Sequence, residues 1–331
     1  MCSFGPGRTG KGVAVADPGE QLQYGAASMY YLQGETMESI ARQLGMSRSS
    51  VSRLLKNARE SGMVQITLNQ PGRSQSSAGR ALEKLFGIRV HVVPVRDGSS
   101  EILRLDRVAR TAGHLFSEAI SDNMLIGVAW GTTLAAVVQH LVPHETFGST
   151  VVQTNGSANH STSGIPYVGA IISGVADAFG CDVVHFPVPA FFDFASTKEA
   201  MWRERMVTRV LGLQSRLDLV IFGVGALEGP LKSHVYASGY LDEEDTQQVI
   251  DEHVVGDICT VLLRRDGSWE DIPLNARASG ITPTQLRTIP RRICVASGQA
   301  KALPLLGALR AKVATDLVVD ELTARTVLEL M

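Results

Sequence analysis

The clearest hydrophobic pattern lies between residues 36 and 62, where two short helical patterns meet at a glycine. Apolar residues recur at helical spacing on each side of it: Ile40, Ala41 and Leu44 before it, and Val51, Leu54 and Leu55 after it. Gly45 supplies the positive φ of a tight corner, Met46 fills the core, and Ser47 caps the second helix. The pattern predicts a helix-turn-helix.

The outward face of the second helix is polar and cationic. It presents Ser47, Arg48, Ser49, Ser52, Arg53 and Lys56. Such side chains contact phosphates and base edges of double-stranded DNA. The alternative is an ordinary helical hairpin with a solvated cationic face. Because the corner glycine, the capping serine and the polar face coincide, we favour DNA binding.

The segments around this motif complete a domain over residues 20–70. Apolar residues spaced along 20–32 predict a third helix packed under the other two. Residues 63–68 alternate apolar and polar side chains, which predicts a strand that could form a wing. Residues 1–19 are rich in glycine and are expected to be disordered. Residues 71–79 have the composition of a linker.

Strand and helix patterns alternate through residues 80–331. Apolar runs predict strands at 90–95, 124–128, 151–153, 182–187, 217–225, 258–263, 292–296 and 317–319. Helical patterns separate them, for example at 108–120 and 165–179. The alternation predicts an α/β domain with a Rossmann-like, doubly wound and mostly parallel sheet that carries helices on both faces.

Candidate ligand-binding residues follow several of these strands. Ligands of open parallel sheets bind at the carboxyl ends of strands, where loops open the next helices. Small polar loops there offer hydroxyls and backbone N–H groups to an anion, Lys301 adds an ammonium, and Asp257 adds an acceptor for sugar hydroxyls. A site for a phosphorylated sugar or polyol is therefore predicted at Thr132, Thr133, Gly156, Ser157, Asp257 and Lys301.

These residues also have purely structural interpretations. Thr132 and Thr133 could belong to a capped strand-to-helix turn, Lys301 could be a solvated helix charge, and Asp257 could satisfy a turn. We expect Asp320 only to cap the last helix, and His185 to be a hydrogen-bonded core residue.

Composition narrows the class of protein. The chain has 331 residues, of which 44% are hydrophobic and 19% charged, with a formal net charge of −2. Two globular domains are expected, and the positive field of the helix-turn-helix is local. The sequence shows neither a membrane-spanning run nor a signal peptide, which predicts a cytoplasmic protein without a membrane partner.

No catalytic or cofactor motif can be assembled from the sequence. The four cysteines are widely separated and show no metal-ligand spacing. The chain carries no Walker loop or Ser/His/Asp order, and residues 223–225 lack the third glycine of a dinucleotide fingerprint. We therefore expect no catalytic residues, no metal and no cofactor.

The combined motifs resemble the SorC family of bacterial sugar-responsive transcriptional regulators. The resemblance covers nearly the whole chain after about residue 21. It rests on Tyr30-Tyr31, Ile40-Ala41, Leu44 to Arg48, Val51 to Leu55, Ala58-Arg59, Gly62, Gly127 to Leu134, Val255 to Ile258, Gly298, Lys301-Ala302, Leu317 to Glu321 and Ala324.

This resemblance implies a winged helix-turn-helix followed by the fold of ribose-5-phosphate isomerase and glucosamine-6-phosphate deaminase, used as a sensor. It also implies a homotetramer, or a dimer of dimers, on an operator with inverted repeats, and a phosphorylated sugar effector that controls a carbohydrate or polyol operon. In the effector site it assigns phosphate to Thr132, Thr133 and Lys301, backbone contacts to Gly156 and Ser157, and hydroxyls to Asp257. Many relatives have paired glycines at 156–157 and 297–298, so the ligand is expected to differ from theirs.

Two other classes of protein fit parts of the pattern. The first is an active isomerase or deaminase with a DNA-binding appendage, in which Asp257 would be the general base. The second is a structural nucleoid protein, which the small basic surface and the large α/β domain disfavour.

Overall fold

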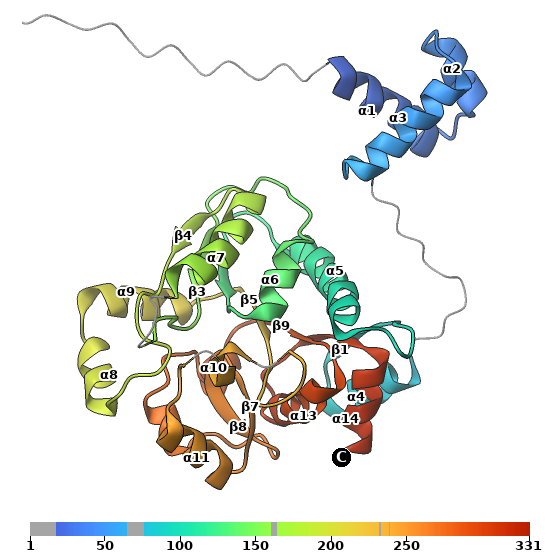
Figure 1. The fold of residues 1–331 in the computed structure, drawn as a ribbon. Helices are drawn as coiled ribbons and strands as arrows, with labels where there is room; N and C mark the ends of the chain where they lie inside the picture. The colour runs from blue at the N-terminus through green and yellow to red at the C-terminus, as the bar shows by residue number, and fades with distance from the viewer. Residues whose placement is uncertain (1–17, 65–75, 160–163, 232, 238) are drawn as a thin grey trace, which may run out of the picture. The chain divides into compact units, whose positions relative to one another are not determined.

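The protein divides into two compact units, residues 1–73 and 74–331. The structure is a computed structural model that describes residues 18–64, 76–159, 164–231, 233–237 and 239–331. Each unit has its own hydrophobic core. Figure 1 shows the helices and strands of both units.

The N-terminal unit contains three helices, α1 (Pro18–Tyr31), α2 (Met37–Gln43) and α3 (Arg48–Glu60). Thr36 caps α2, and the Ser47 side chain caps α3 by accepting from the Ser50 N–H at 3.1 Å. Gly45 has φ 65° at the corner between them, as the helix-turn-helix prediction requires. The core of the unit consists of Ala26, Ala27, Ile40, Ala41, Val51, Leu55 and Ala58.

Three predictions for the N-terminal half fall partly or wholly outside the described residues. These are the disordered tail up to residue 17, the wing strand beyond Val64 and the linker up to residue 75. The last two residues of the predicted tail, Pro18 and Gly19, are described and already belong to helix α1. The predicted linker ends too late. Helix α4 (Ser77–Phe86) already begins at Ser77, because Ser76 caps it and Ala78 is buried in the core.

The C-terminal unit is built on a seven-stranded parallel sheet with the order β1-β10-β9-β5-β2-β3-β4. Its strands are β1 (Arg89–Val93), β2 (Leu125–Val128), β3 (Thr150–Gln153), β4 (Asp182–Val184), β5 (Leu219–Gly223), β9 (Arg291–Ala296) and β10 (Asp316–Asp320). The doubly wound α/β fold predicted from the sequence is thereby confirmed.

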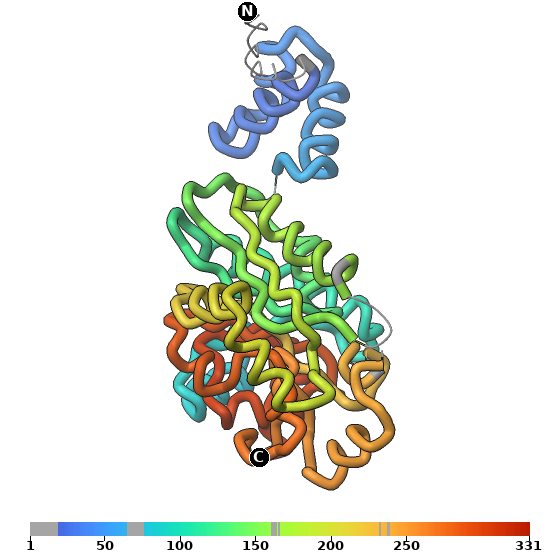
Figure 2. Tube along the Cα trace, turned by 90° about the vertical axis from the view of Figure 1, so that its left-hand side faces the viewer, coloured from blue at the N-terminus to red at the C-terminus, as the bar shows by residue number. Residues whose placement is uncertain are grey.

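Helices cover both faces of this sheet (Figures 1 and 2). One core contains residues of α4, α9 (Arg205–Gln214), α13 (Ala302–Arg310) and α14 (Glu321–Glu329). The other contains residues of α5 (Glu101–Ala119), α6 (Thr132–Val138) and α7 (Ile165–Phe179). The alternating side chains of β5 divide between them, because Val220 and Phe222 enter the first core while Leu219 and Ile221 enter the second.

The prediction of a single strand at 258–263 is wrong. Residues 254–264 form an antiparallel hairpin, β7 (Val254–Ile258) and β8 (Val261–Arg264), which joins β6 (Gly225–Ala226) in a separate three-stranded sheet. Cys259 and Thr260 turn the chain with φ 48° and 68°. The turn was hidden in the sequence because neither residue is a usual former of such turns.

The remaining elements are short and lie between the strands. They are α8 (Ala195–Met201), α10 (His234–Ala237), α11 (Glu243–Asp251), η1 (Pro273–Ala276), α12 (Pro283–Leu286) and η2 (Gln299–Lys301). Within the described ranges, no helix has the length and apolar character needed to cross a membrane.

Candidate functional site

The strand order places a topological switch point between β2 and β5. Strands β3 and β4 continue the sheet on one side of β2, whereas β5, β9 and β10 continue it on the other. The chain therefore leaves β2 towards one side of the sheet and leaves β5 towards the other. Two adjacent parallel strands whose following connections run in opposite directions leave a crevice at their carboxyl ends. A cavity lies there, lined by residues that follow β2, β5 and β9 together with the turn of the β7–β8 hairpin.

Four of the predicted ligand-binding residues line this cavity: Thr132, Thr133, Asp257 and Lys301. Thr132 and Thr133 open helix α6, whose first backbone hydrogen bond to an earlier residue runs from Ala135 N–H to Gly131. Their own N–H groups precede that bond and so lack helical partners. The Thr132 side chain also hydrogen-bonds Tyr167, whose hydroxyl pKa is raised by burial and lowered in part by this contact.

Lys301 is 9% exposed and is held in the short helix η2 that follows β9. Its ammonium donates a hydrogen bond of 2.8 Å to Thr133 Oγ1. Burial lowers the pKa of Lys301 to about 8, although the nearby Asp257 carboxylate opposes this shift. The interpretation of Lys301 as a solvated helix charge is therefore wrong.

Asp257 lies on β7 and is 5% exposed. Its Oδ2 accepts from the Thr260 N–H at 3.2 Å, so it does satisfy the hairpin turn. Its Oδ1 makes no hydrogen bond of ordinary geometry among the described residues, but the buried Tyr236 hydroxyl interacts with this carboxylate. Burial raises the pKa of Asp257 to about 6, while Tyr236, Thr260 and Lys301 lower it in part.

Gly156 and Ser157 lie outside the residues that line the cavity. The Gly156 N–H donates to Ser279 Oγ at 3.0 Å, and the Ser157 N–H donates to the Val188 carbonyl at 3.1 Å. Their backbone donors are thus occupied by the protein. Asn155, immediately before them, is the residue of this loop that lines the cavity.

Aromatic residues that the sequence reasoning missed hold this loop. Trp130 lines the cavity and donates from Nε1 to the Gly156 carbonyl at 3.0 Å. The Tyr240 hydroxyl donates to the Ser157 carbonyl at 2.8 Å, and its ring lies 5.5 Å from that of Trp130. The position of Trp130 directly before Gly131 was the only available signal. His185, predicted as a core residue, is exposed, because β4 ends at Val184 and the chain leaves the sheet there.

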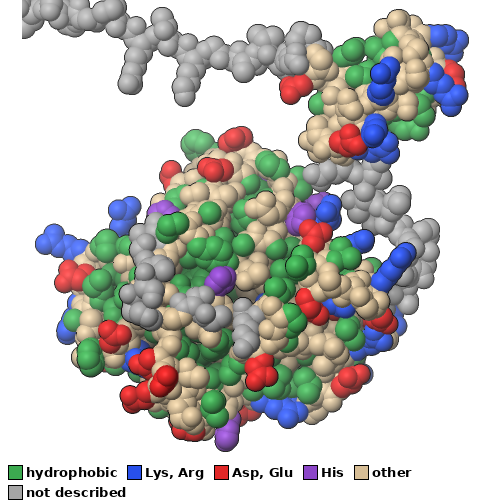
Figure 3. All heavy atoms as spheres, in the orientation of Figure 1, with side chains coloured by type: hydrophobic (Ala, Val, Ile, Leu, Met, Phe, Trp, Pro, Cys, Tyr) green, Lys and Arg blue, Asp and Glu red, His purple; other side chains and the backbone are tan. Residues whose placement is uncertain are grey.

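The predicted DNA-contact residues of α3 are all exposed: Ser47, Arg48, Ser49, Ser52, Arg53 and Lys56. Arg48 forms an ion pair with Glu38 at 3.1 Å, and Lys56 forms one with Glu60 at 3.6 Å. Within the described part of the chain, Arg53 forms no ion pair and has its guanidinium available. Figure 3 shows Lys and Arg side chains at the surface of this unit.

Comparison with protein families assigns a class to each unit. The Sugar-bind family, which describes a sugar-binding domain, matches residues 73–329. Region 4 of sigma-70 matches residues 28–61, which hold the helix-turn-helix.

Whole-chain relatives and solved structures agree with this assignment. The chain is 32% identical to the deoxyribonucleoside regulator of Bacillus subtilis, over 92% of this chain and 96% of the relative. It is similar in structure to the full-length sorbitol operon regulator SorC of Klebsiella pneumoniae, with a TM-score of 0.78, 25% identity and coverage of 95% and 100% of the two chains. It is 47% identical to a solved domain of a possible sugar-binding transcriptional regulator from Arthrobacter aurescens, with a TM-score of 0.72 and coverage of 78% and 99%.

Proposed function

The chain belongs to the SorC family of sugar-binding transcriptional regulators, and on this premise we propose that a phosphorylated sugar or polyol, bound in the cavity, changes its affinity for operator DNA. Its family and its relatives are transcriptional regulators, and the chain is likewise a transcriptional regulator and not an enzyme. The sugar-phosphate isomerase or deaminase considered from the sequence is therefore set aside.

The buried ammonium of Lys301 carries the proposal. An ammonium removed from water is unfavourable unless anionic or polar groups surround it. In the described residues, the Lys301 ammonium has one hydrogen bond, to Thr133, and no direct ion pair. Its other donors, the Thr132 hydroxyl and the first N–H groups of α6 line the same cavity. A phosphate group supplies the missing negative charge and the acceptor oxygens.

Asp257 supports a sugar or polyol as the rest of the ligand. Asp257 lines the cavity, and its carboxylate is opposed by few donors: the Thr260 N–H binds Oδ2, and the buried Tyr236 hydroxyl interacts with the carboxylate without a hydrogen bond of ordinary geometry. Hydroxyl groups of a sugar can supply further donors to this carboxylate. Relatives whose names refer to a sorbitol operon and to erythritol catabolism support a carbohydrate or polyol operon as the target.

The DNA-binding part of the proposal concerns α3. We propose that Ser47, Arg48, Ser49, Ser52, Arg53 and Lys56 contact an operator with inverted repeats, bound by a homotetramer or dimer of dimers. The effector shifts the packing between subunits and thereby the spacing of paired recognition helices. Sedimentation of the protein with and without operator DNA tests the assembly.

A thermal-shift screen tests the ligand class. Each phosphorylated compound is paired with its free form, such as ribose 5-phosphate with ribose and sorbitol 6-phosphate with sorbitol. A ligand that binds only the folded state raises the melting temperature. We expect a rise with a phosphorylated member that is absent with its free partner and is lost in Lys301→Met.

Lys198→Met is the matched control for this screen. Lys198 is half-buried, and burial lowers its pKa as it does that of Lys301, but it lies over the Trp202 ring in another part of the unit. The rise should persist in Lys198→Met. Rises confined to unphosphorylated compounds would contradict a phosphate site at Lys301.

A further inference from the structure

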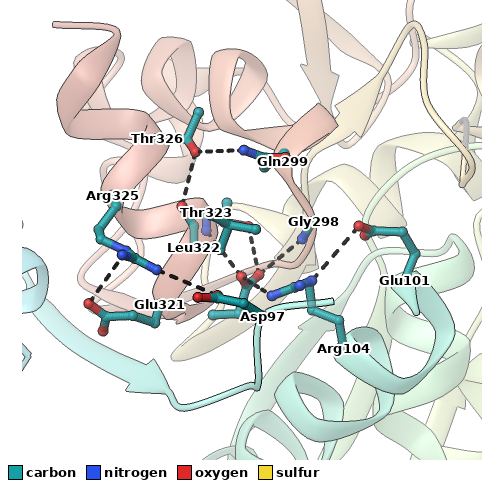
Figure 4. A network of polar contacts seen from close by, with 11 residues as sticks. Asp97, Glu101, Arg104, Gly298, Gln299, Glu321, Leu322, Thr323, Arg325 and Thr326 are labelled. Carbon is teal, nitrogen blue, oxygen red and sulfur yellow. Dashed lines mark hydrogen bonds and ion pairs between the residues drawn. The ribbon is translucent and has the colours of Figure 1, made fainter. Parts of the chain in front are cut away.

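The buried carboxylate of Asp320 joins three elements of the C-terminal unit. Figure 4 shows Arg104, Gly298 and Thr323, which come from these three elements. Its Oδ1 accepts from Arg104 Nη1 at 2.9 Å and from the Thr323 N–H at 3.0 Å. Its Oδ2 accepts from the Gly298 N–H at 3.0 Å and from the Thr323 hydroxyl at 2.6 Å. Asp320 thus links α5, the loop after β9 and the start of α14.

These contacts exceed what a helix cap requires. Capping of α14 needs only the bond from the Thr323 N–H to Oδ1. Arg104 is 2% exposed, so an arginine has been buried on α5 to meet this carboxylate. The expectation that Asp320 only caps the last helix is therefore wrong.

The Glu101 carboxylate lies next to the loop after β9 and forms an ion pair with Arg104 at 3.8 Å. Gly298 has φ 97°, and a Cβ added there would lie 2.2 Å from Glu101 Oε2. Glu101 stands in the first turn of α5, one turn before Arg104. Gly298 is therefore confined between an acceptor on β10 and a carboxylate on α5, in a conformation that side chains rarely adopt.

A continuous series of hydrogen bonds leads from this point to the candidate effector site. The Gly298 carbonyl accepts from the Lys301 N–H at 2.9 Å, which closes the single turn of η2. The Lys301 ammonium then donates to Thr133 at 2.8 Å. A displacement of Gly298 must therefore move the backbone from which the Lys301 side chain extends.

We propose that Asp320, held by Arg104, is a positioning residue that fixes the loop after β9 so that the Lys301 ammonium meets Thr133 in the cavity. It acts through Gly298 and does not contact the effector. The link to effector binding rests on the proposed function, but the placement of the Lys301 amine can be measured without any effector.

The test compares Asp320→Asn with Asp316→Asn. Asparagine still caps α14 through its carbonyl, but its NH₂ group cannot accept from the Gly298 N–H. Asp316 is a matched control at the amino end of the same strand. Its side chain is equally buried and accepts two hydrogen bonds from Arg89 at 2.8 and 2.9 Å, far from the cavity.

The first readout is the pKa of the Lys301 amine, measured by competitive acetylation across a pH series and mass spectrometry. In Asp320→Asn we expect the pKa to rise from about 8 towards the ordinary value of 10.5, because the amine leaves its buried position. In Asp316→Asn we expect no change. A folded Asp320→Asn protein with an unchanged Lys301 pKa would overturn the proposal.

Gly298→Ala provides a second variant if Asp320→Asn does not fold. Alanine is strained at the φ of 97° that Gly298 adopts, so the loop should shift and the Lys301 pKa should again rise. An unchanged value in this variant would equally overturn the proposal.

The second readout is binding of inorganic phosphate by titration calorimetry, which we expect to weaken in Asp320→Asn and not in Asp316→Asn. If the wild-type protein binds neither phosphate nor sugar phosphates, the proposed effector class is rejected. A raised Lys301 pKa in Asp320→Asn would still support the positioning role in that case.

Discussion

At the scale of single residues, the ionisation of Lys301 gives the candidate site a pH range. Its pKa of about 8 leaves the amine charged below that pH and neutral above it. A phosphate monoester becomes a dianion above about pH 6, and Asp257, with a pKa of about 6, ionises over the same range. We expect the affinity for a phosphorylated ligand to be highest between these values and to fall as the pH rises through 8.

Titration calorimetry at several pH values, with the ligand found in the thermal-shift screen, measures this profile. The decrease above pH 8 should be absent in Lys301→Met, whose remaining affinity no longer depends on that amine. A decrease that persists in Lys301→Met would assign it to another group.

Arg53 and Arg59 are exposed cations of α3 that form no ion pair among the described residues, and Arg53 lies nearer the amino end of the helix, the part that contacts bases in a helix-turn-helix. If it makes a bidentate contact with a base, Arg53→Ala should lose about 1–3 kcal/mol of operator binding, with little loss on random DNA. Fluorescence anisotropy with both DNAs at one salt concentration measures the two losses.

Arg59→Ala, in the last turn of α3, is the control for this comparison. Arg59→Ala should leave the affinity for both DNAs unchanged or lower both affinities by the same factor. An equal loss on both DNAs in Arg53→Ala would instead identify Arg53 as a phosphate contact.

At the scale of elements, the cap of α3 determines how firmly the recognition helix is held. Ser47 accepts from the Ser50 N–H, so Ser47→Ala should cost about 1 kcal/mol and Ser47→Gly only a few tenths. Hydrogen exchange of the α3 amides in the full-length protein without DNA should become about fivefold faster in Ser47→Ala. Exchange as slow as in the wild type would show that the capping bond does not hold this helix.

Hydrophobic periodicity predicted most elements but missed the beginning of α5. The helical pattern indicates a start near Val108, whereas the helix begins at Glu101. In its first turns a charged side chain is buried and an apolar one is exposed, the opposite of the usual pattern: Arg104 is buried, whereas Ile102 is 74% exposed. A pattern of apolar residues cannot reveal a face that buries an arginine for a carboxylate more than two hundred residues away.

Those residues of the candidate site that directly follow the carboxyl end of a strand could be predicted from the sequence. Thr132, Thr133 and Lys301 follow strands β2 and β9, so topology brings them to one edge of the sheet. Gly156 and Ser157 also follow a strand, but side-chain and backbone partners from other segments occupy their N–H groups. Such partners come from packing and leave no local pattern in the sequence.

At the scale of the whole molecule, Asp316 makes the stability of the C-terminal unit depend on pH. Burial raises the pKa of its carboxyl group. Four neighbouring side chains have the opposite and larger effect and hold the pKa well below its usual range; they are those of His91, Arg89, Thr315 and Arg291. A lowered folded-state pKa contributes stability above the unfolded value of about 3.9, and this contribution is lost as the pH falls through the folded value.

Asp316→Asn should therefore be less stable than the wild type at pH 7, with a difference that narrows below about pH 4. Urea unfolding followed by tryptophan fluorescence reports on this unit, because all three tryptophans lie in it. A difference that stays constant down to pH 2 would show that the charge of Asp316 is not its source.

The pairing of β1 with β10 has a consequence for the order in which the protein is made. Among the strands that the structure describes, β1 lies at the edge of the sheet and has β10 as its one partner, more than two hundred residues later. At about 5–20 residues per second, a ribosome needs about 10 to 45 s to synthesise the intervening chain. The described core of the N-terminal unit, with the residues packed against it, ends at Val64. We therefore expect each nascent chain to carry a folded DNA-binding unit before its sensor exists, and a premature stop to release a DNA-binding fragment that no sugar controls.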